Sequence, residues 1–208
     1  MTRTGISPDL AEVLGVLLGD GCLCRYVSRG RTNFQVAFTA HPKEFHYYQT
    51  FVKPTMESSF GVRGHLYLRN DNTTRYHLFG KKLADQLIEL GIPVGKKRDA
   101  CIPTAVKDCG QVVPFIRGIY HAEGSIYRRY SKRYNTHVRV YDNLLTIQIR
   151  MKLRTLMFEI CEELNNRGIL TNRLTEKDGV YTLRITNQSM IRGFLDAVRP
   201  KYKTSPRE

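Results

Sequence analysis

The stretch LGVLLGDGCL, residues 14–23, decides how the rest of the sequence is read. It begins as an apolar helix and ends with an acid between two glycines, Gly19-Asp20-Gly21. The C-terminus of a helix carries partial negative charge, so a carboxylate there is electrostatically disfavoured. Two interpretations follow: a solvated acid beside a turn, or an acid that holds a bound positive charge.

A second stretch, FIRGIYHAEGSI at residues 115–126, follows the same plan and ends on Ala122-Glu123-Gly124. After each stretch, the periodicity and turn residues predict strand, strand, helix, strand, strand and helix in that order. The chain is therefore divided into a first repeat over residues 1–91 and a second over residues 113–208. Between them, residues 92–112 are rich in Pro, Gly and charge, which is typical of a linker.

The composition favours a polyanion as partner. The chain has 208 residues, a formal net charge of +14 and a pI near 9.8. Such an excess of Lys and Arg points to DNA, RNA or an anionic membrane surface. No apolar run approaches the roughly 18 residues that span a bilayer, and the N-terminus lacks the apolar core of a secretory signal. We therefore expect a nucleic-acid partner, no membrane association, and a cytoplasmic location close to the nucleoid.

Cysteine usage predicts neither a disulfide framework nor a zinc finger. There are five cysteines, an odd number, and no pair has C-x-x-C spacing. Cys22 and Cys24 form C-x-C without a nearby His or Cys to complete a zinc-finger spacing. We expect unpaired thiols, as is usual in a reducing cell.

The two quoted stretches resemble the signature helices of the LAGLIDADG homing endonucleases, in the single-chain, two-motif form typical of archaeal introns. The resemblance covers nearly the whole chain, roughly residues 8–199. It implies an α+β fold in which two pseudo-symmetric αββαββα repeats form a saddle of two antiparallel sheets. The motif helices would pack side by side at the interface between repeats, with Gly15 and Gly118 allowing their close approach.

The same resemblance assigns the two acids a role. Asp20 and Glu123 would meet near the pseudo-twofold axis and hold Mg²⁺, with Mn²⁺ or Ca²⁺ able to occupy the same sites. Hard oxygen ligands suit such ions, and the carbonyls of Gly19 and Ala122 would be further ligands or near neighbours. At the positions where the family places polar and basic residues around the metal, this chain has His41 and Lys152 as catalytic candidates.

Alternation along the predicted strands gives polar faces suited to DNA. Alternate residues of a strand share one face, so in RTNFQVAFT, residues 31–39, the polar set faces DNA and the apolar set packs on helices. Arg, Asn and Gln suit the reading of purines in the major groove. The predicted DNA-binding set is Arg25, Arg31, Asn33, Gln35, Arg63, His65, Tyr67, Arg69, Arg75, His77, Ser125, Tyr127, Arg129, Lys132, Arg133, Arg139, Thr146, Gln148, Arg150, Arg173, Thr175, Lys177, Thr182 and Arg184.

Other basic residues are better suited to phosphates than to bases. The run Gly95-Lys96-Lys97-Arg98 in the linker is one such group, and the tail with Arg199, Lys201 and Lys203 is another. The segment at residues 128–139 is expected to be an extended strand or loop that reaches along the DNA backbone.

The resemblance implies a monomeric, site-specific endonuclease. It would break both strands of a long double-stranded DNA target by metal-dependent phosphodiester hydrolysis, leaving short 3′ overhangs. Two alternatives on the same fold stay open: an intron maturase whose partner is intron RNA, and a non-cleaving DNA-binding regulator. Retention of both acids argues against a pure maturase, and such a regulator typically loses one or both. A basic ribosome-associated protein outside the family would leave the duplicated motif unexplained.

Overall fold

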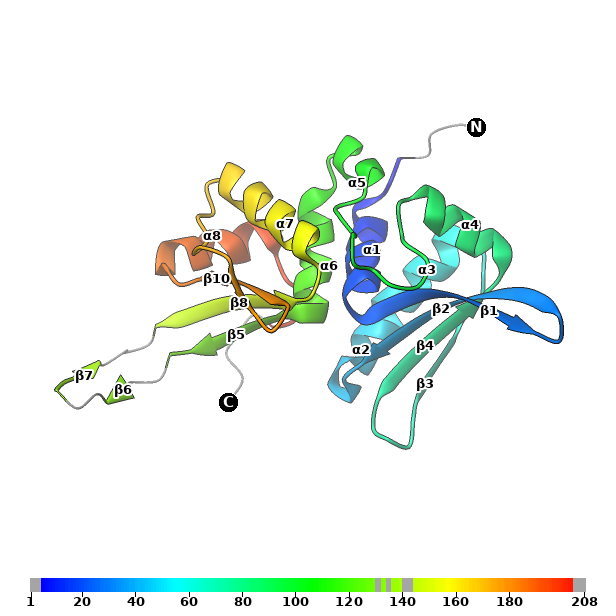
Figure 1. The fold of residues 1–208 in the computed structure, drawn as a ribbon, viewed down its shortest axis with the longest axis horizontal. Helices are drawn as coiled ribbons and strands as arrows, with labels where there is room; N and C mark the ends of the chain where they lie inside the picture. Colours follow the sequence, from blue (N-terminus) through cyan, green and yellow to red (C-terminus); the bar gives the residue numbers. More distant parts are fainter. Residues whose placement is uncertain (1–4, 130–131, 134–135, 140–143, 204–208) are drawn as a thin grey trace.

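The computed structural model of the protein describes residues 5–203 apart from 130–131, 134–135 and 140–143. It consists of two similar halves around a central pair of helices, as the sequence predicts (Figure 1). The elements of the first half are α1 (Pro8–Asp20), β1 (Gly21–Ser28), β2 (Arg31–Ala40), η1 (Pro42–Glu44), α2 (Phe45–Tyr47), η2 (Tyr48–Val52), α3 (Lys53–Phe60), β3 (His65–Leu68), β4 (Thr74–Phe79) and α4 (Lys81–Glu89).

The second half repeats this order after a short connecting helix, α5 (Thr104–Asp108). Its elements are α6 (Val112–Glu123), β5 (Gly124–Arg128), β6 (Lys132–Arg133), β7 (Val138–Arg139), β8 (Leu145–Met151), α7 (Arg154–Asn166), β9 (Thr175–Lys177), β10 (Val180–Ile185) and α8 (Gln188–Val198). The strand order is β1-β2-β4-β3 in one sheet and β5-β8-β10-β9 in the other, which is the same order in each half. The pairs within both sheets are antiparallel, so the duplication extends to sheet topology.

Helix α1 begins and ends where its sequence predicts. The Ser7 hydroxyl accepts a hydrogen bond from the Leu10 N–H at 3.2 Å, and Pro8 occupies the first turn, where no intrahelical donor is needed. At the other end, Gly21 adopts an extended conformation and starts β1 directly. Asp20 is therefore held between a buried helix and a strand rather than on a free loop.

The central contact joins α1 to α6 through glycine. A Cβ added to Gly15 would overlap the backbone oxygen of Phe115, and one added to Gly118 would overlap the backbone oxygen of Glu12. Near the C-terminal ends, a Cβ on Gly19 would overlap the methyl group of Ala122. The close approach expected for Gly15 and Gly118 is present, and it brings the ends of the two motifs together.

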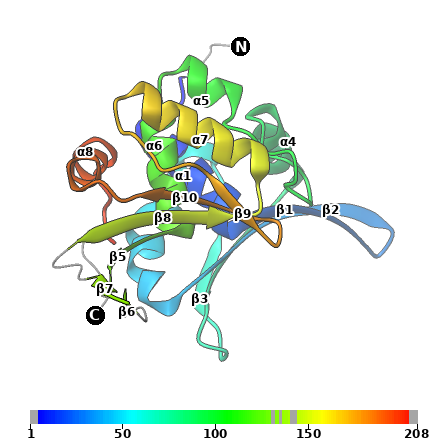
Figure 2. The ribbon, with the colours of Figure 1, turned by 60° about the vertical axis from the view of Figure 1, so that its left-hand side comes forward.

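Each sheet has one face covered by helices and one face open. In Figure 1 the helices α4, α5, α7 and α8 lie above the sheets, and Figure 2 shows the same layering from another side. Side chains on the covered face of the first sheet, such as Val36, Phe38 and Tyr76, are at most 1% exposed. The intervening residues are partly or fully exposed, as the predicted alternation requires.

Three local features differ from the sequence predictions. The helical segment after β2 contains a π-helical turn, η2, directly before α3; Pro54 in the first turn of α3 has no N–H to continue the regular pattern. The linker contains a helix of its own, α5, because Pro103 presets the entry to it. The segment at residues 128–139, expected as an extended strand or loop, contains an additional strand pair, β6 and β7, between the first two strands of the second sheet.

The five cysteines are free thiols, as the sequence predicts. None of the described helices is both long enough and apolar enough to cross a bilayer.

Replacing Gly118 by Ala is expected to lower the free energy of unfolding by about 2 to 3 kcal/mol, since two backbones must separate to admit one methyl group. Gly193→Ala is the matched control: Gly193 is also helical, and its added Cβ would meet only Ile169 Cγ1 at 3.9 Å. That change should be neutral or stabilising by up to about 1 kcal/mol. Urea unfolding of both variants tests the contact, and equal stability of the two would contradict it.

Candidate active site

A cleft of about 720 Å³ lies where the two motif helices end, and both halves line it. The two acids and both predicted catalytic residues meet there, although they come from four separate segments. The lining residues that bear on its chemistry are Asp20, Thr39, His41, Glu44, Ala122, Glu123, Arg150, Lys152 and Lys203.

Two acids of the cleft, Asp20 and Glu123, are held in an environment that resists their ionisation. Burial raises the pKa of Asp20 to about 7; the carboxylates of Glu44 and Glu123 act in the same direction, while Lys203 and Lys97 oppose them. Burial also raises the pKa of Glu123, again against the two lysines. Carboxylates that are close, buried and near helix C-termini gain most from a cation placed between them.

Lys97 is folded inward at the end of α1. Its ammonium group donates to the carbonyl oxygens of Leu18 at 2.6 Å, Gly19 at 2.9 Å and Gly21 at 2.8 Å. A helix C-terminus leaves carbonyls without intrahelical partners, and a cation there also offsets the helix dipole. Burial lowers the pKa of Lys97, while Glu123, Cys22 and Asp20 favour its charged form.

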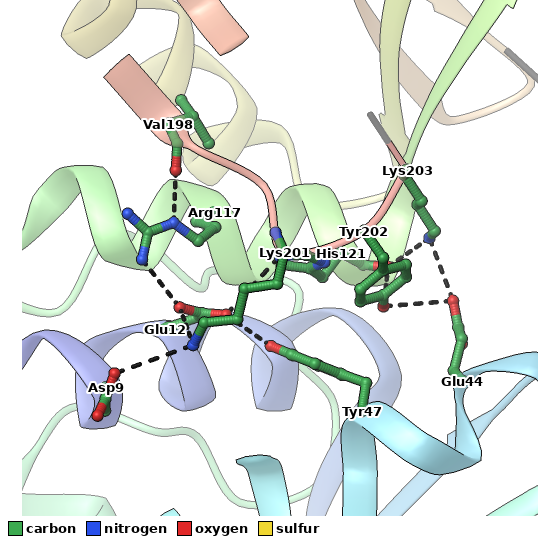
Figure 3. Close-up of polar contacts among 10 residues, drawn as sticks. All are labelled: Asp9, Glu12, Glu44, Tyr47, Arg117, His121, Val198, Lys201, Tyr202 and Lys203. Carbon is green, nitrogen blue, oxygen red and sulfur yellow. Dashed lines mark hydrogen bonds and ion pairs between the residues drawn. The ribbon is translucent and has the colours of Figure 1, made fainter. Parts of the chain in front are cut away.

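Lys203 has the equivalent place at the end of α6. Its ammonium group donates to the carbonyl oxygen of His121 and forms an ion pair with Glu44 at 3.2 Å. The Tyr202 hydroxyl donates to the same His121 carbonyl at 3.0 Å and approaches Glu44 at 3.4 Å. The C-terminal segment thereby joins the second motif helix to the first half (Figure 3).

Each half therefore carries a lysine, after its last helix, back to the end of its own motif helix. This corrects the prediction that Lys97, Lys201 and Lys203 contact phosphates, because internal carbonyls and carboxylates engage all three. Lys96 and Arg98 are exposed, so phosphate contact remains the prediction for these two residues. The equivalent placement of Lys97 and Lys203 in the two repeats is the sequence signal that could have identified them.

His41 has a structural function in addition to its place in the cleft. The ring Nδ1 of His41 accepts a hydrogen bond from the backbone N–H of Lys43 at 3.2 Å, and the backbone N–H of His41 donates to the Glu44 carboxylate at 3.1 Å. Together these two hydrogen bonds form a capping box. Lys152 is exposed in the turn between β8 and α7, at the equivalent point of the second half. Catalytic roles for His41 and Lys152 remain predictions. Both residues line the cleft, as such roles require.

The two predicted carbonyl ligands differ. Ala122 lines the cleft, whereas the carbonyl oxygen of Gly19 already accepts a hydrogen bond from Lys97. Among the described residues there is no group of three or more His, Cys, Asp or Glu side chains arranged around a cation. A hard cation bound by Asp20 and Glu123 would therefore need further oxygen atoms from water or from a phosphate, which is the usual arrangement for Mg²⁺.

A second polar cluster lies where the two motif helices meet the C-terminal segment (Figure 3). Glu12 of α1, which is 0% exposed, pairs with Arg117 and Lys201 at 3.0 Å each and accepts from the Tyr47 hydroxyl at 2.8 Å. Burial and the nearby cations lower the pKa of His121 to about 3, so this ring is neutral and accepts from the Lys201 N–H. Sequence reasoning missed this cluster.

The open face of the first sheet carries most of its predicted DNA-binding residues. Backbone register places Arg31, Asn33 and Gln35 of β2 on the face that also holds Arg75 and His77 of β4. The side chains of Gln35 and His77 contact each other at 3.3 Å across the strands. His65 and Tyr67 of β3 share this face, and Arg63 and Arg69 are exposed at its edge.

Arg25 lies on a different side of the first sheet from the other predicted strand residues. It pairs with Phe34 and has the same parity as Leu23, so it belongs to the opposite, helix-covered side of β1. Its exposure arises because the outer half of β1 extends beyond the helices. It does not share the open face with Arg31 and Asn33.

The open face of the second sheet is held by its own hydrogen bonds. Gln148 accepts from Arg184 at 3.2 Å and from the Tyr127 hydroxyl at 3.3 Å. Thr146 is 2% exposed beneath Arg129, which donates to it at 3.1 Å, and Thr182 is 7% exposed. These two threonines are therefore too buried to be free base contacts.

The remaining predicted residues of this half divide into two groups. Ser125, Arg150, Thr175 and Lys177 lie on the open face, and Arg173 is exposed just before β9. Lys132, Arg133 and Arg139 lie on the small β6–β7 pair, and nothing is described of the side chains of these three residues.

Glu12→Gln is expected to lower the free energy of unfolding by about 2 to 4 kcal/mol, because Arg117 and Lys201 lose the buried negative charge that they share. Asp85→Asn is the control. Asp85 forms a surface ion pair with Lys81, and the side chains of Lys81 and Asp85 are 74% and 47% exposed. Its loss should lower the free energy of unfolding by less than about 1 kcal/mol. Thermal unfolding of the two variants measures the difference. Comparable losses would show that the cluster contributes no more than a surface pair.

Comparison with known proteins finds solved structures with a similar fold. No protein-family model and no curated protein matches the sequence. Among solved structures, mesophilic variants of the homing endonuclease I-DmoI share 22% identity with a TM-score of 0.66, over 93% of this chain and 96% of that chain. The LAGLIDADG meganuclease I-AabMI shares 15% identity with a TM-score of 0.61, over 92% and 83% of the two chains. A mutant of I-SmaMI shares 13% identity with a TM-score of 0.63, over 95% and 85%.

Identity at this level shows the fold. In this chain, two motif helices are in contact and each is followed by a sheet of the same strand order. The chain has the fold of the LAGLIDADG homing endonucleases, as its two signature stretches predict.

Proposed function

We propose that the protein is a site-specific endonuclease that cuts both strands of duplex DNA with the help of divalent cations. The observation that carries this proposal is the meeting of Asp20 and Glu123 in one cleft, flanked by two open sheet faces rich in Arg, Asn and Gln. A net charge of +14 suits a long DNA target. Solved relatives of this fold include I-DmoI in complex with DNA and Mn, and with DNA and Ca.

The cleft residues would bind and orient the scissile phosphates. Asp20 and Glu123 would hold the cations, for which Mg²⁺ is the proposed physiological choice. Bound divalent cations would supply Lewis-acid stabilisation of the phosphate and a more acidic water. Lys152 and Arg150, which line the same cleft, would bind a phosphate oxygen, and His41 would orient a water molecule.

One acid from each half suggests one cut for each strand. The pseudo-twofold arrangement would give staggered cuts with short 3′ overhangs, made by a single chain acting as a monomer. A location at the nucleoid belongs to the same proposal. The second candidate, a maturase for intron RNA, would use the same basic sheets without needing both acids, and a non-cleaving regulator would not need the cleft.

The test is a cleavage selection from a randomised duplex library, in Mg²⁺ and then in EDTA. Asp20→Asn and Glu123→Gln should each slow cleavage by at least about a hundredfold, as expected for an essential polar group of an active site. Both should bind the selected DNA within a few-fold of the unmodified protein. Glu89→Gln, an exposed acid at the end of α4, is the control and should cut normally. Binding without metal-dependent cutting by the unmodified protein would favour the maturase or the regulator.

Cation binding should strengthen as pH rises through about 7. The carboxyl group of Asp20, with its pKa raised to about 7, keeps its proton below that pH and must lose it to bind a cation. Affinity should therefore fall by up to about tenfold for each pH unit below 7. Isothermal titration calorimetry with Mn²⁺ at pH 6 and pH 8 measures this. Asp71→Asn, in the exposed β3–β4 turn, should keep the full pH dependence, and Asp20→Asn should weaken both the binding and its pH dependence.

A further inference from the structure

The open face of the first sheet carries large aromatic side chains that are exposed to solvent. Tyr26, Tyr67 and Phe79 are 40%, 42% and 48% exposed. Exposed phenyl and phenol rings that share one surface are unusual unless a partner covers them. The polar-face prediction for this sheet did not include Tyr26 or Phe79.

Register places these rings among the predicted base-reading residues. Tyr26 pairs with Asn33, Phe79 pairs with Gln35, and Tyr67 pairs with Arg75. Directly opposed residues of neighbouring strands point to the same side, so the rings and the polar groups form one surface.

His77 joins two of the rings. Its ring meets that of Tyr67 at 5.8 Å and that of Phe79 at 6.4 Å, both edge to face. The contacts hold these rings in a continuous row with His77 between them. This row lies beside Gln35 and Arg75, which oppose Phe79 and Tyr67 in register.

The second sheet has no such row. Among the described strand residues of its open face, Tyr127 is the only aromatic side chain, and its hydroxyl is bonded to Gln148. The rest of that face is dominated by Arg, Gln and Thr with mutual hydrogen bonds, such as those from Arg184 to Gln148 and Thr175. The two duplicated halves therefore present different chemistry to a common partner.

In the major groove, the apolar group that a protein can contact is the C5-methyl group of thymine. Aromatic side chains could instead stack on unpaired bases, as they do in single-strand binders. Contact with thymine methyl groups is favoured over stacking, because the rings alternate with Asn33, Gln35 and Arg75, whose side chains suit the edges of paired bases. Gln beside an apolar group matches an A·T pair, since it can bond adenine while the neighbour covers the thymine methyl.

We propose that the first sheet recognises thymine methyl groups, so that its half of the DNA target is rich in A·T pairs. Tyr26, Tyr67 and Phe79 supply the apolar contacts, and Asn33 and Gln35 supply hydrogen bonds to adenine. The second sheet selects its half of the target by hydrogen bonding from Arg and Gln. The proposal rests on the proposed function, since it names the bases read by that DNA-binding surface.

The test compares duplex libraries that differ only in the methyl group. Asp20→Asn protein, which should bind without cutting, selects sites from randomised DNA made with thymine and from the same library made with uracil. One half-site should be enriched in A·T pairs. Replacing its thymines by uracil should weaken binding by about fourfold for each contacted methyl, the affinity equivalent of one buried methyl group.

Substitution of Phe79 tests whether the aromatic rings cause the difference in affinity between thymine and uracil DNA. Phe79→Ala in the same Asp20→Asn background should lose most of the difference between thymine and uracil, while Phe79→Leu should keep part of it. Phe158→Ala is the matched control, because Phe158 is 51% exposed but lies on α7, at the covered side of the second sheet. It should leave the uracil effect unchanged. Since both phenylalanines are about half exposed, neither change should impair folding.

The possible outcomes distinguish failure of the thymine proposal from failure of the proposed endonuclease function. Failure to select any duplex sequence would overturn the proposed function. Selection of a specific duplex whose affinity ignores the methyl groups, or a Phe79→Ala response equal to that of Phe158→Ala, would overturn the thymine proposal alone. Tighter binding of the single strand than of the duplex, lost in Phe79→Ala, would also overturn it and assign the rings to stacking on unpaired bases.

Discussion

The structure depends on the close contact of two helices through glycine. Gly15 lies against the backbone of Phe115, and Gly118 lies against the backbone of Glu12. These are equivalent points of the two motifs, so the crossing has twofold character. Because no side chain separates the backbones there, the C-terminal ends of both helices meet, and the acids that follow them are forced into one cleft.

That arrangement concentrates negative charge. Two helix C-termini and the carboxylates of Asp20, Glu123 and Glu44 converge, and burial keeps water from screening them. The chain offsets part of this charge with Lys97 and Lys203, one from each half, bound to the terminal carbonyls. The remaining imbalance contributes to the raised pKa values of Asp20 and Glu123. This imbalance favours a cation bound between the acids.

Around this symmetric frame, the two halves have diverged. Glu12 is buried with Arg117 and Lys201, while Phe115 stands at the corresponding position of the second motif. The charged cluster can therefore form in one orientation only, which suits two halves joined in a single chain. The sheets differ in the same way, with exposed rings on one open face and a hydrogen-bonded polar surface on the other. Such differences fit an asymmetric partner.

The repeated motif, the order of elements and the alternation of the strands were readable in the sequence alone, because they depend on local periodicity and on glycine at defined positions. Tertiary structure alone decided which charges meet. Lys97, Lys201 and Lys203 read as free surface cations, yet they fold inward because long-range packing places unpaired carbonyls and buried carboxylates beside them. Likewise, the face to which Arg25 belongs depends on strand register. Sequence spacing carries no record of such contacts between distant segments, and here they determine the electrostatics of the site.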